Sequence, residues 1–554
     1  MDLLINRLPM SNRPSSFSPQ STVESEGGHD VSLRYRANVG WGNPQGEVRG
    51  ASPQVAPWAR NPIRVWEYGV MDGVDSPATY VPEPHVIVLF GATGDLARRK
   101  LIPGLFHLDQ AGLLPPFRIV GVSLDDIDDD TFRDIAGDSC KQYARCVVDD
   151  PSWRAFAANL HYVPQPAGPS RLGDMVKALE YEMDTDARRL HYLSIPPVAA
   201  SSVVHMLAEA GLVERARIVM EKPFGTDLAS ARALNDTVHE VFTEDQVFRI
   251  DHFLGKEAAQ NILAFRFANG LFEPIWNRDH IDHVQIDVPE TLSVGTRADF
   301  YESTGAFRDM VVTHLFQILA FMAMEPPTAL EPRAISEEKN KVFRSMVPLD
   351  PAQVIRGQYE GYRSTPGVNP RSETETFVAL RAEIDNWRWA GVPFFLRTGK
   401  QMAEGARIIS IAFREPPKSM FPENSGVGTM GPDHLTFDLA DSSKLSLSFY
   451  GKRPGPGMKL DKLSLQFALH ETGQEADVLE AYERLIHDAM CGDHTLFNTA
   501  EGIERLWEVS APLLENPPQV LPYWAGSWGP ATIDNLISPH SWRLPFRRGW
   551  RSKS

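Results

Sequence analysis

The sequence predicts two folded domains, an α/β domain followed by a larger α+β domain with a mostly antiparallel sheet. Between residues 85 and 225, short apolar runs alternate with stretches of helical pattern. This alternation is typical of a parallel sheet covered by helices on both faces. From about residue 284, polar and apolar residues alternate within the expected strands, which favours an antiparallel sheet with one face on the core. A chain of 554 residues is also too long for one core.

Four strands are expected in the first domain, each of them a short and mostly apolar run. They cover residues 85–90, 117–122, 190–195 and 217–221. Helices are expected after the first strand and after the third, over residues 98–107 and 198–212. The third strand ends at two consecutive prolines, which cannot continue a hydrogen-bonded ladder.

The second domain is expected to hold strands at His283–Val288 and Lys444–Tyr450, together with an amphipathic helix over residues 305–317. We place the first domain at residues 81–250 and the second at residues 251–535. No internal repeat is visible.

The two ends of the chain differ in composition from the rest. Residues 1–80 are rich in Ser, Pro, Gly and Asn with weak periodicity, so we expect a low-complexity, disordered extension. Residues 536–554 are expected to form a basic tail, solvated from Trp542 onward, where five basic residues and no acid occur. An internal start at Met71 would remove nearly all of the extension.

Composition excludes several classes of partner. A net charge of −17 argues against nucleic acid, because phosphate backbones require a basic footprint. The apolar runs are too short to span a membrane, and the amino terminus lacks the apolar core of a secretory signal. Three cysteines (Cys140, Cys146, Cys491) form no disulfide framework, so we expect free thiols and a cytoplasmic location.

A glycine turn follows the first expected strand. The turn Gly91-Ala-Thr-Gly-Asp-Leu-Ala97 connects this strand to the helix at residues 98–107. Small residues at this point let backbone N–H groups and a helix N-terminus approach a pyrophosphate. A plain tight turn is the alternative, but strand, glycine turn and helix in this order favour a Rossmann dinucleotide-binding domain.

A second cluster of polar residues occupies Arg249-Ile-Asp-His-Phe-Leu-Gly-Lys-Glu257. In a helix or tight turn, His252 and Lys256 would project from one face. Lys as a point charge and His as a directed donor suit a phosphate dianion. A solvated, salt-bridged surface segment is the alternative for this pair alone.

The whole nonapeptide resembles the substrate-binding signature of the glucose-6-phosphate dehydrogenase family, which has Tyr where this chain has Phe253. Other segments resemble the same family in the same order. They are residues 91–100, 221–225 (Glu-Lys-Pro-Phe-Gly), 305–317, 397–400 (Arg-Thr-Gly-Lys), 481–486 and 522–530. The resemblance therefore covers roughly residues 85–530.

The resemblance implies an enzyme that oxidises β-D-glucose 6-phosphate at C1, the first step of the oxidative pentose phosphate pathway. It implies NADP as the cofactor, with NAD possible and no metal, and a homodimer or homotetramer. His314 would be the general base and Asp251 the carboxylate that orients it, although a lone His on such a helix is more often a core residue. The implied substrate-binding residues are Lys222, His252, Phe253, Lys256, Glu290, Asp309 and Lys400. The implied cofactor-binding residues are Gly91, Ala92, Thr93, Gly94, Asp95, Leu96, Arg98 and Lys222.

Three positions depart from the family pattern. Leu124 stands where members that prefer NADP commonly have Arg, and residues 125–130 are rich in Asp. A carboxylate prefers a free ribose 2′-hydroxyl to a 2′-phosphate, so we expect the preference for NADP to be modest or reversed. The alternative is that the acids only cap a helix, with Arg98 or Arg99 supplying the cation.

The other departures concern the substrate. Phe253 lacks the family's hydroxyl, and Gly405 stands where a second basic residue is usual, with Arg407 nearby. Two other functions remain open from the sequence: a different Rossmann-type sugar oxidoreductase, or a non-catalytic paralogue that binds a nucleotide or a sugar phosphate.

Overall fold

A computed structural model describes residues 81–428, 431–439, 444–468 and 479–543. The expected extension at residues 1–80 and most of the basic tail, residues 544–554, lie outside the described residues.

The first sheet has the strand order of a Rossmann fold. Its parallel strands are β1 (His85–Phe90), β2 (Phe117–Ser123), β3 (Leu160–Pro164), β4 (Arg188–Leu193), β5 (Ala216–Met220) and β6 (Val247–Ile250), in the order β3-β2-β1-β4-β5-β6. This order has its topological switch point between β1 and β4, where such sheets bind dinucleotides. The short strand β15 (Phe497–Asn498) adds to β6 in the antiparallel sense.

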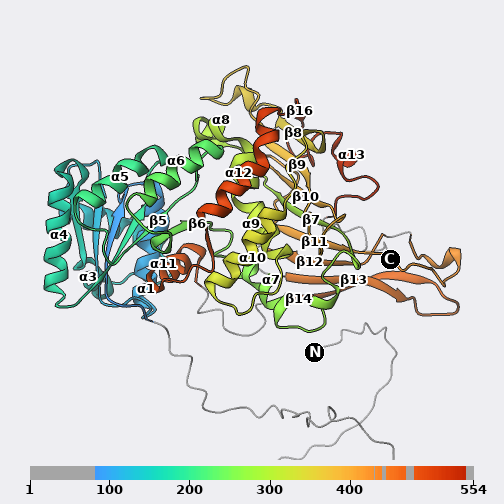
Figure 1. Cartoon of the computed structure of the whole chain (residues 1–554), viewed down its shortest axis with the longest axis horizontal. Coiled ribbons are helices and arrows are strands. Elements are labelled where there is room, and N and C mark those ends of the chain that lie inside the picture. The colour runs from blue at the N-terminus through green and yellow to red at the C-terminus, as the bar shows by residue number, and fades with distance from the viewer. Residues whose placement is uncertain (1–80, 429–430, 440–443, 469–478, 544–554) are drawn as a thin grey trace, which may run out of the picture. The chain divides into compact units, whose positions relative to one another are not determined.

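Helices cover this sheet, as the first view shows (Figure 1). They are η1 (Ala97–Leu101), α1 (Ile102–Gln110), α2 (Asp129–Tyr143), α3 (Asp150–Ala157), α4 (Gly168–Glu182), α5 (Pro197–Glu209) and α6 (Leu228–His239), with short turns η2 (Gln165–Ala167) and η3 (Glu244–Gln246). The four expected strands are confirmed to within two residues. Strands β3 and β6 were missed because each is short and is interrupted by a polar side chain, His161 in β3 and Arg249 in β6. Arg249 is buried and pairs with Glu244 at 2.8 Å.

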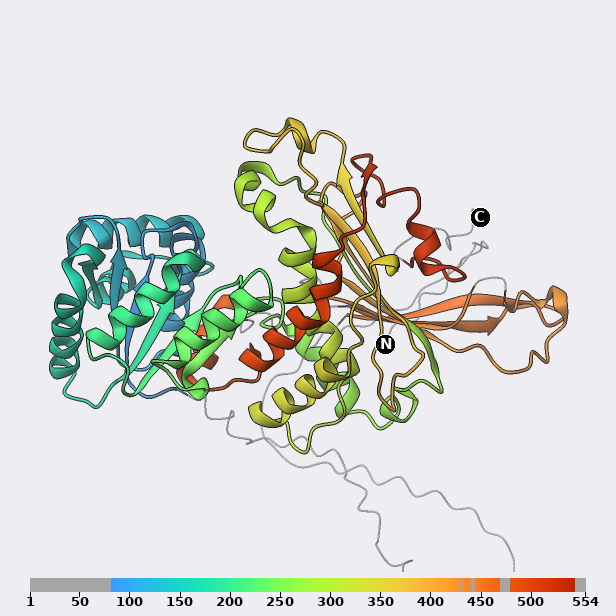
Figure 2. The same ribbon diagram turned by 45° about the horizontal axis from the view of Figure 1, so that its top comes forward.

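The second sheet is mostly antiparallel, as expected. Its order is β14-β13-β12-β11-β7-β10-β9-β8-β16, and only the pairs β10–β7 and β16–β8 are parallel among the described strands. The strands are β7 (Ile281–Pro289), β8 (Val354–Tyr359), β9 (Phe377–Ala382), β10 (Phe394–Gly399), β11 (Ile408–Phe413), β12 (His434–Asp438), β13 (Lys444–Lys452), β14 (Leu460–Ala468) and β16 (Val520–Tyr523). Strands β13 and β14 project as a two-stranded ribbon (Figure 2).

Helices pack against this sheet and against the first one. They are α7 (Glu257–Phe267), α8 (Ala298–Ala306), η6 (Phe307–Leu315), α9 (Phe316–Ala323), α10 (Pro332–Ser345), α11 (Ala481–Cys491), α12 (Ala500–Glu515) and α13 (Ile533–Ile537), with short turns η4 (Glu273–Ile275), η5 (Gly295–Arg297), η7 (Pro351–Gln353), η8 (Tyr362–Ser364) and η9 (Glu423–Ser425). Both β15 and α11 lie against the first sheet, so the chain returns there after the second sheet (Figure 1).

The helical run from α8 through α9 is a core element. We expected an amphipathic helix at residues 305–317. The helix is confirmed, as η6 and the start of α9, but its amphipathic character is wrong, because every residue from Phe307 to Ala323 except Arg308 is buried. By length and composition alone, the helix Ala298–Ala323 could cross a membrane. However, 94% of its most apolar 18-residue stretch is buried inside the protein. Its apolar character is therefore explained by packing on all sides.

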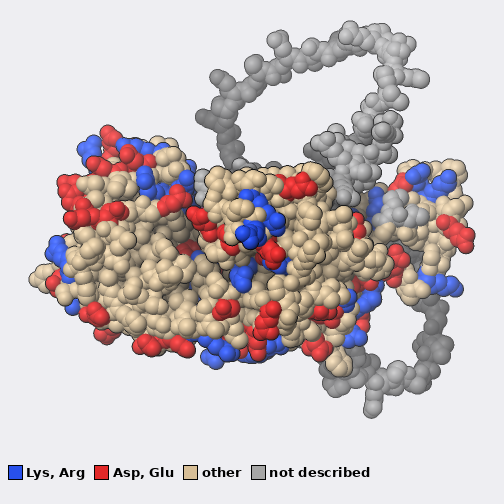
Figure 3. Space-filling model, turned by 90° about the horizontal axis from the view of Figure 1, so that it is seen from above, with Lys and Arg blue, Asp and Glu red and all other residues tan. Residues whose placement is uncertain are grey.

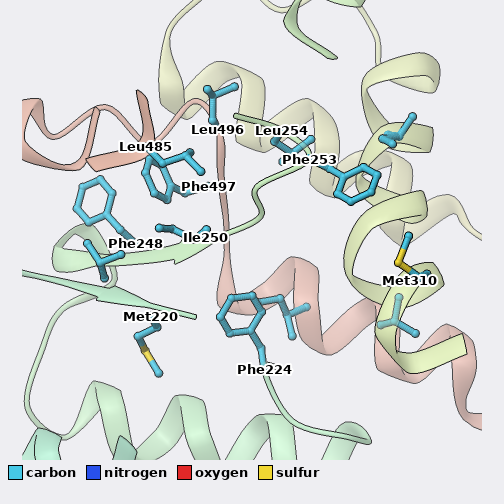
Figure 4. Packing of buried hydrophobic residues seen from close by; sticks show 14 of the residues in the cluster. Met220, Phe224, Phe248, Ile250, Phe253, Leu254, Met310, Leu485, Leu496 and Phe497 are labelled. Atoms are coloured by element: carbon cyan, nitrogen blue, oxygen red, sulfur yellow. The ribbon is translucent and has the colours of Figure 1, made fainter. Parts of the chain in front are cut away.

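Apolar side chains fill the space where the first sheet meets this run. Figure 4 shows Ile250, Phe248 and Phe497 packed together at the end of β6, while Phe253 lies against the helix that carries Met310. This packing fixes the position of the segment that follows β6.

The start of the expected tail is not solvated. Trp542 is buried, and the Arg397 guanidinium lies 4.4 Å from its ring centroid. The backbone N–H of Arg543 donates to Gln285 Oε1 at 2.9 Å. The tail expectation therefore does not hold for these two residues, because a buried cation holds the indole.

Candidate active site

The predicted site residues of the first domain follow strands at one edge of the parallel sheet. Gly91 follows β1, Leu124 follows β2, Lys222 follows β5 and Asp251 follows β6. Parallel strands have their carboxyl ends on the same edge, about 4.8 Å apart from one neighbour to the next. A ligand crossing this edge would meet Leu124 first and Asp251 last.

The glycine turn is a close-packed cradle at the switch point. Gly91 has a φ of +73°, and a Cβ there would lie 2.1 Å from the Ser194 carbonyl oxygen at the end of β4. No other residue fits this position. The N–H of Gly94 donates to the Gly91 carbonyl at 2.9 Å, which closes the turn. Backbone without side chains at this point suits the close approach of a pyrophosphate, so the residues fit a dinucleotide.

The other predicted cofactor residues surround this turn. Ala92 is buried and Arg98 is exposed, while Leu96 is the residue before η1. Asp95 pairs with Arg99 at 2.7 Å, which occupies that arginine within its own helical turn.

Thr93 ties the turn to the end of β2. Its hydroxyl lies 3.0 Å from Ser123 Oγ and donates to Asp125 Oδ2 at 2.6 Å. The acid-rich segment is therefore not only a helix cap. Asp128 does cap α2, where it accepts from the N–H of Thr131, but Asp125 faces the glycine turn.

A π-helix positions the residues of the central run. Gly305, with a φ of +69°, breaks the helix before it, and the N–H of Phe307 donates to Glu375 Oε1 at 3.1 Å. The run then continues as η6, where the N–H of Phe316 bonds to the Val311 carbonyl, five residues back. Asp309 and His314 are also five apart, so this geometry brings both to one face.

His314 and Asp251 form a buried pair. His314 Nδ1 lies 2.6 Å from Asp251 Oδ1, and both side chains are 1% exposed. The N–H of Phe253 donates to the same carboxylate oxygen at 2.8 Å. Because a carboxylate accepts hydrogen bonds, the proton of the neutral imidazole lies on Nδ1 and its Nε2 carries a lone pair.

Lys222 faces that lone pair. Its ammonium lies 2.8 Å from His314 Nε2 and 2.9 Å from Asp309 Oδ1. Burial, and then the charge of Lys222, hold the pKa of His314 well below its usual value. Burial would raise the pKa of Asp309, but the Lys222 ammonium outweighs it and the pKa is lowered. His314 is therefore poised as an unprotonated base beside a cation.

The segment after Asp251 is a tight turn that carries two aromatic rings against His314. The Phe253 ring stacks on the imidazole with centroids 4.3 Å apart, and the His252 ring stands edge-on at 4.8 Å. A Cβ on Gly255 would lie 2.9 Å from the Ala481 carbonyl, so glycine is needed for α11 to approach. That approach stacks Tyr482 on His252 at 6.1 Å.

A cavity of about 640 Å³ opens beside this turn. Its basic lining residues come from both domains: Arg99, Lys100, Arg145, Lys256 and Arg407. His252 and Phe253 form the wall toward His314. The sequence left open whether a second basic residue contacts the substrate, because Gly405 stands at the usual position. Arg407 lines this cavity, with its guanidinium 5.9 Å from the Phe253 ring centroid. Arg145 and Tyr482 are lining residues that our candidate site omitted.

Lys400 and Glu290 form an ion pair at the ends of β10 and β7. The parallel register of these strands puts Gly399 beside Pro289, one residue before each partner. The Tyr523 hydroxyl donates to the Lys400 carbonyl at 2.6 Å, which anchors this end of β10. The charge of Lys400 also helps to lower the pKa of Asp309.

Metal binding does not suit this centre. One ligand atom from each of Asp251, His252 and His314 lies within 4.8 Å of the other two. The Lys222 ammonium, 2.8 Å from His314 Nε2, would stand directly against a second cation.

Comparison with known proteins assigns the family. Models of the NAD-binding domain and the C-terminal domain of glucose-6-phosphate dehydrogenase match residues 88–261 and 263–550. Glucose-6-phosphate 1-dehydrogenase of Rhizobium meliloti is 41% identical over 476 residues, which are 82% of this chain and 96% of that protein. The chain belongs to the glucose-6-phosphate dehydrogenase family.

Other members of this family are similar over the same span. Glucose-6-phosphate 1-dehydrogenase 2 of Mycobacterium tuberculosis is 37% identical, covering 88% of this chain and 99% of that protein. The crystal structure of the Mycobacterium avium enzyme covers 84% of this chain and 100% of that one, with 36% identity and a TM-score of 0.74. A glucose-6-phosphate dehydrogenase in complex with glucose 6-phosphate gives 31% identity, a TM-score of 0.78 and coverage of 84% and 99%.

The His314→Asn variant of this glucose-6-phosphate dehydrogenase family member tests the base. We expect kcat to fall by roughly 10²–10⁴, the usual effect of losing a positioned base, with KM for glucose 6-phosphate little changed. Steady-state kinetics give both constants, and thermal unfolding confirms that the variant folds.

The exposed residue His205 provides the control, since His205→Asn should leave kcat unchanged. A His314→Asn enzyme with near-native kcat would place the base elsewhere.

Proposed function

We propose that this protein oxidises β-D-glucose 6-phosphate at C1 to 6-phospho-D-glucono-1,5-lactone and thereby feeds the oxidative pentose phosphate pathway. The observation that carries the proposal is the His314–Asp251 pair, which faces Lys222 and adjoins a basic cavity.

The chemistry follows from this geometry. The C1 hydroxyl proton passes to His314 Nε2. The hydrogen on C1 leaves as hydride, with the electron pair of the C–H bond, so that C1 becomes a carbonyl carbon. The bound nicotinamide supplies the hydride acceptor. Asp251 stabilises the imidazolium that forms and holds its orientation, as a carboxylate does in a catalytic triad. No metal is needed, and the intact dyad favours this reading over a non-catalytic paralogue.

Phosphate recognition is assigned to the turn and the cavity. Burial lowers the pKa of His252 to about 3, so this imidazole is neutral in the free enzyme. The expected cationic pair is therefore a neutral donor, His252, beside the ammonium of Lys256. Arg407 lines the same cavity. Such a cluster distinguishes a sugar phosphate from an unphosphorylated sugar.

The Lys256→Met variant tests this assignment. A hydrogen bond to a charged group contributes about 1.5–3 kcal/mol, so KM for glucose 6-phosphate should rise roughly 10- to 100-fold. The KM for glucose should change little, because glucose has no phosphate to lose. Glu257→Gln, next in the chain and also at the cavity, is the matched control and should not raise KM. An equal rise for both sugars would show that Lys256 serves the fold.

For the cofactor, we propose that NAD is accepted at least as well as NADP, although the family resemblance puts NADP first. Support comes from the edge of the glycine turn, where Thr93 is bonded to Asp125 and Leu124 is exposed. A carboxylate there can accept from a ribose 2′-hydroxyl but repels a 2′-phosphate. Arg99 is engaged with Asp95, so Arg98, which is exposed, is the cation that would have to turn toward the 2′-phosphate to offset this.

The Asp125→Asn variant should raise kcat/KM for NADP by about tenfold, which corresponds to ~1.4 kcal/mol, while kcat/KM for NAD falls or stays. Leu124→Arg should raise the NADP value further by pairing with the 2′-phosphate. Asp126→Asn removes a neighbouring exposed acid and serves as the control. A strong native preference for NADP, unaltered in all three variants, would refute this account.

We also propose that the chain forms a homo-oligomer through β13 and β14. Three cross-strand pairs, Leu445–Phe467, Leu447–Leu465 and Phe449–Leu463, put six apolar side chains on one face of the ribbon. The three on β14 are about half exposed, and β14 is the open edge of its sheet. An apolar edge of this kind calls for a partner strand or face. A second copy supplies an identical apolar face, as twofold symmetry requires.

The Leu465→Glu variant should break this assembly, because it buries a charge in the apolar face. Light scattering after size exclusion should give a multiple of 61.8 kDa for the native chain and about one such mass for the variant. Gln466→Glu changes the next residue, on the opposite face of β14, and should remain oligomeric. A monomeric native chain would contradict the proposal.

We propose a cytoplasmic location. All three cysteines are free thiols, as expected, and burial raises the pKa of Cys140 to about 12, so this thiol is inert.

On the face shown in Figure 3, basic and acidic side chains of the described residues are interspersed rather than gathered in one broad basic field, which offers little to a nucleic-acid backbone.

A further inference from the structure

Lys339 is a buried lysine that the reaction chemistry above does not use. It belongs to α10 and its side chain is 3% exposed. Among the described residues its ammonium has one hydrogen-bond contact, to the Phe497 carbonyl at 3.5 Å, and it lies 5.3 Å from the Phe321 ring centroid. A contact of 3.5 Å is at the limit of a hydrogen bond. A buried ammonium is costly unless an anion faces it. Lys339 therefore needs a negative charge nearby.

The Phe497 contact places Lys339 near the end of β6, which Asp251 follows. Phe497 pairs with Ile250 in the β15–β6 ladder, and Ile250 directly precedes Asp251. Asp251 Oδ1 is taken by His314 Nδ1 and the Phe253 N–H, whereas its Oδ2 has no hydrogen-bond partner among the described residues. The buried ammonium thus contacts the residue that pairs with Ile250, one position before a buried carboxylate whose Oδ2 lacks a donor.

The charges around the two groups agree with this assignment. Burial lowers the pKa of Lys339 to about 8, and the charge of Asp251 is the opposing influence. Burial raises the pKa of Asp251 to about 6, opposed by His252, Lys222 and Lys339. The other ionisable groups that face Asp251 are His314, Glu221 and Tyr482. Beside Lys339 on α10, Glu338 pairs with Lys341 at 2.6 Å and is not its counter-ion.

We propose that the Lys339 ammonium is the buried counter-charge that keeps Asp251 a carboxylate and thereby keeps His314 oriented as the base. Lys339 is a positioning residue: it acts on the reaction through Asp251 and touches neither substrate nor cofactor. The inference deepens the proposed oxidation and rests on it for its kinetic consequence, but the pairing itself can be tested without turnover.

A stability cycle tests the pairing. Asp251→Asn leaves the Lys339 ammonium buried without its anion, and Lys339→Met leaves the carboxylate without its cation, so each single variant should lower Tm. The double variant Asp251→Asn/Lys339→Met removes both charges and should recover a large part of the Tm lost in Asp251→Asn. Lys341→Met, on the same helix, is the control and should not rescue Asp251→Asn.

The alternative is that Lys339 merely fastens β15 through the Phe497 carbonyl. In that case the two losses add, and the double variant is less stable than either single one, which would overturn the proposal. Because the rescue is read in the double variant, the test stands even if Lys339→Met alone does not fold.

A kinetic arm tests the consequence. Without the nearby cation, Asp251 takes up a proton more readily, so the acidic limb of kcat against pH should move to higher pH by roughly one unit in Lys339→Met. The KM for glucose 6-phosphate should hardly change. Lys339→Arg keeps the charge and should keep the native profile. An unmoved limb in a folded Lys339→Met enzyme, or the same shift in both variants, would overturn the role. An inactive native enzyme would instead refute the proposed function and leave the stability cycle intact.

Discussion

The buried hydrogen bond between Asp251 and His314 is the contact on which the site depends. It joins the end of β6, in the parallel sheet, to η6, in the central helical run of the second domain. For both side chains to meet at 2.6 Å, the apolar packing around Ile250 and Phe253 has to hold the turn, and the π-helix has to turn His314 toward it. A carboxylate and an imidazole this deeply buried are stable only as partners, so fold and chemistry impose the same geometry.

Around this contact, buried and partly buried charged side chains have partners drawn from different parts of the chain. Lys222 faces Asp309, Lys400 faces Glu290, and the inferred pairing sets Lys339 beside Asp251. Ion pairs in a low-dielectric interior are costly to leave incomplete. The arrangement therefore rigidifies the site before any ligand binds, which is the condition for an effective base and an aligned substrate.

The cavity and the glycine turn have different requirements, although Arg99 and Lys100, which line the cavity, follow the turn directly in η1. The turn excludes side chains so that backbone N–H groups can meet a pyrophosphate, whereas the cavity gathers long cationic side chains from both domains. Asp125 adds a carboxylate to the turn, where it accepts a hydrogen bond from Thr93. Arg407 adds a guanidinium to the lining of the cavity. Both effects are local and leave the fold unchanged.

The sequence by itself determined the two sheets, the glycine turn and the family, because strand periodicity, positive-φ glycine and a nine-residue signature are local properties. It missed β6, since the charge on Arg249 hides a buried strand until Glu244 is placed beside it. It also took the helix at residues 305–317 for an amphipathic one, since the packing that buries its remaining face comes from distant parts of the chain. The positions of the cavity residue Arg407 and the buried Lys339 were decided only by the tertiary structure, because Arg407 meets Phe253 and Lys339 meets Phe497 across more than 150 residues of chain. The sequence does not show which charged side chains will lie next to one another, because only the packed fold brings these distant residues together.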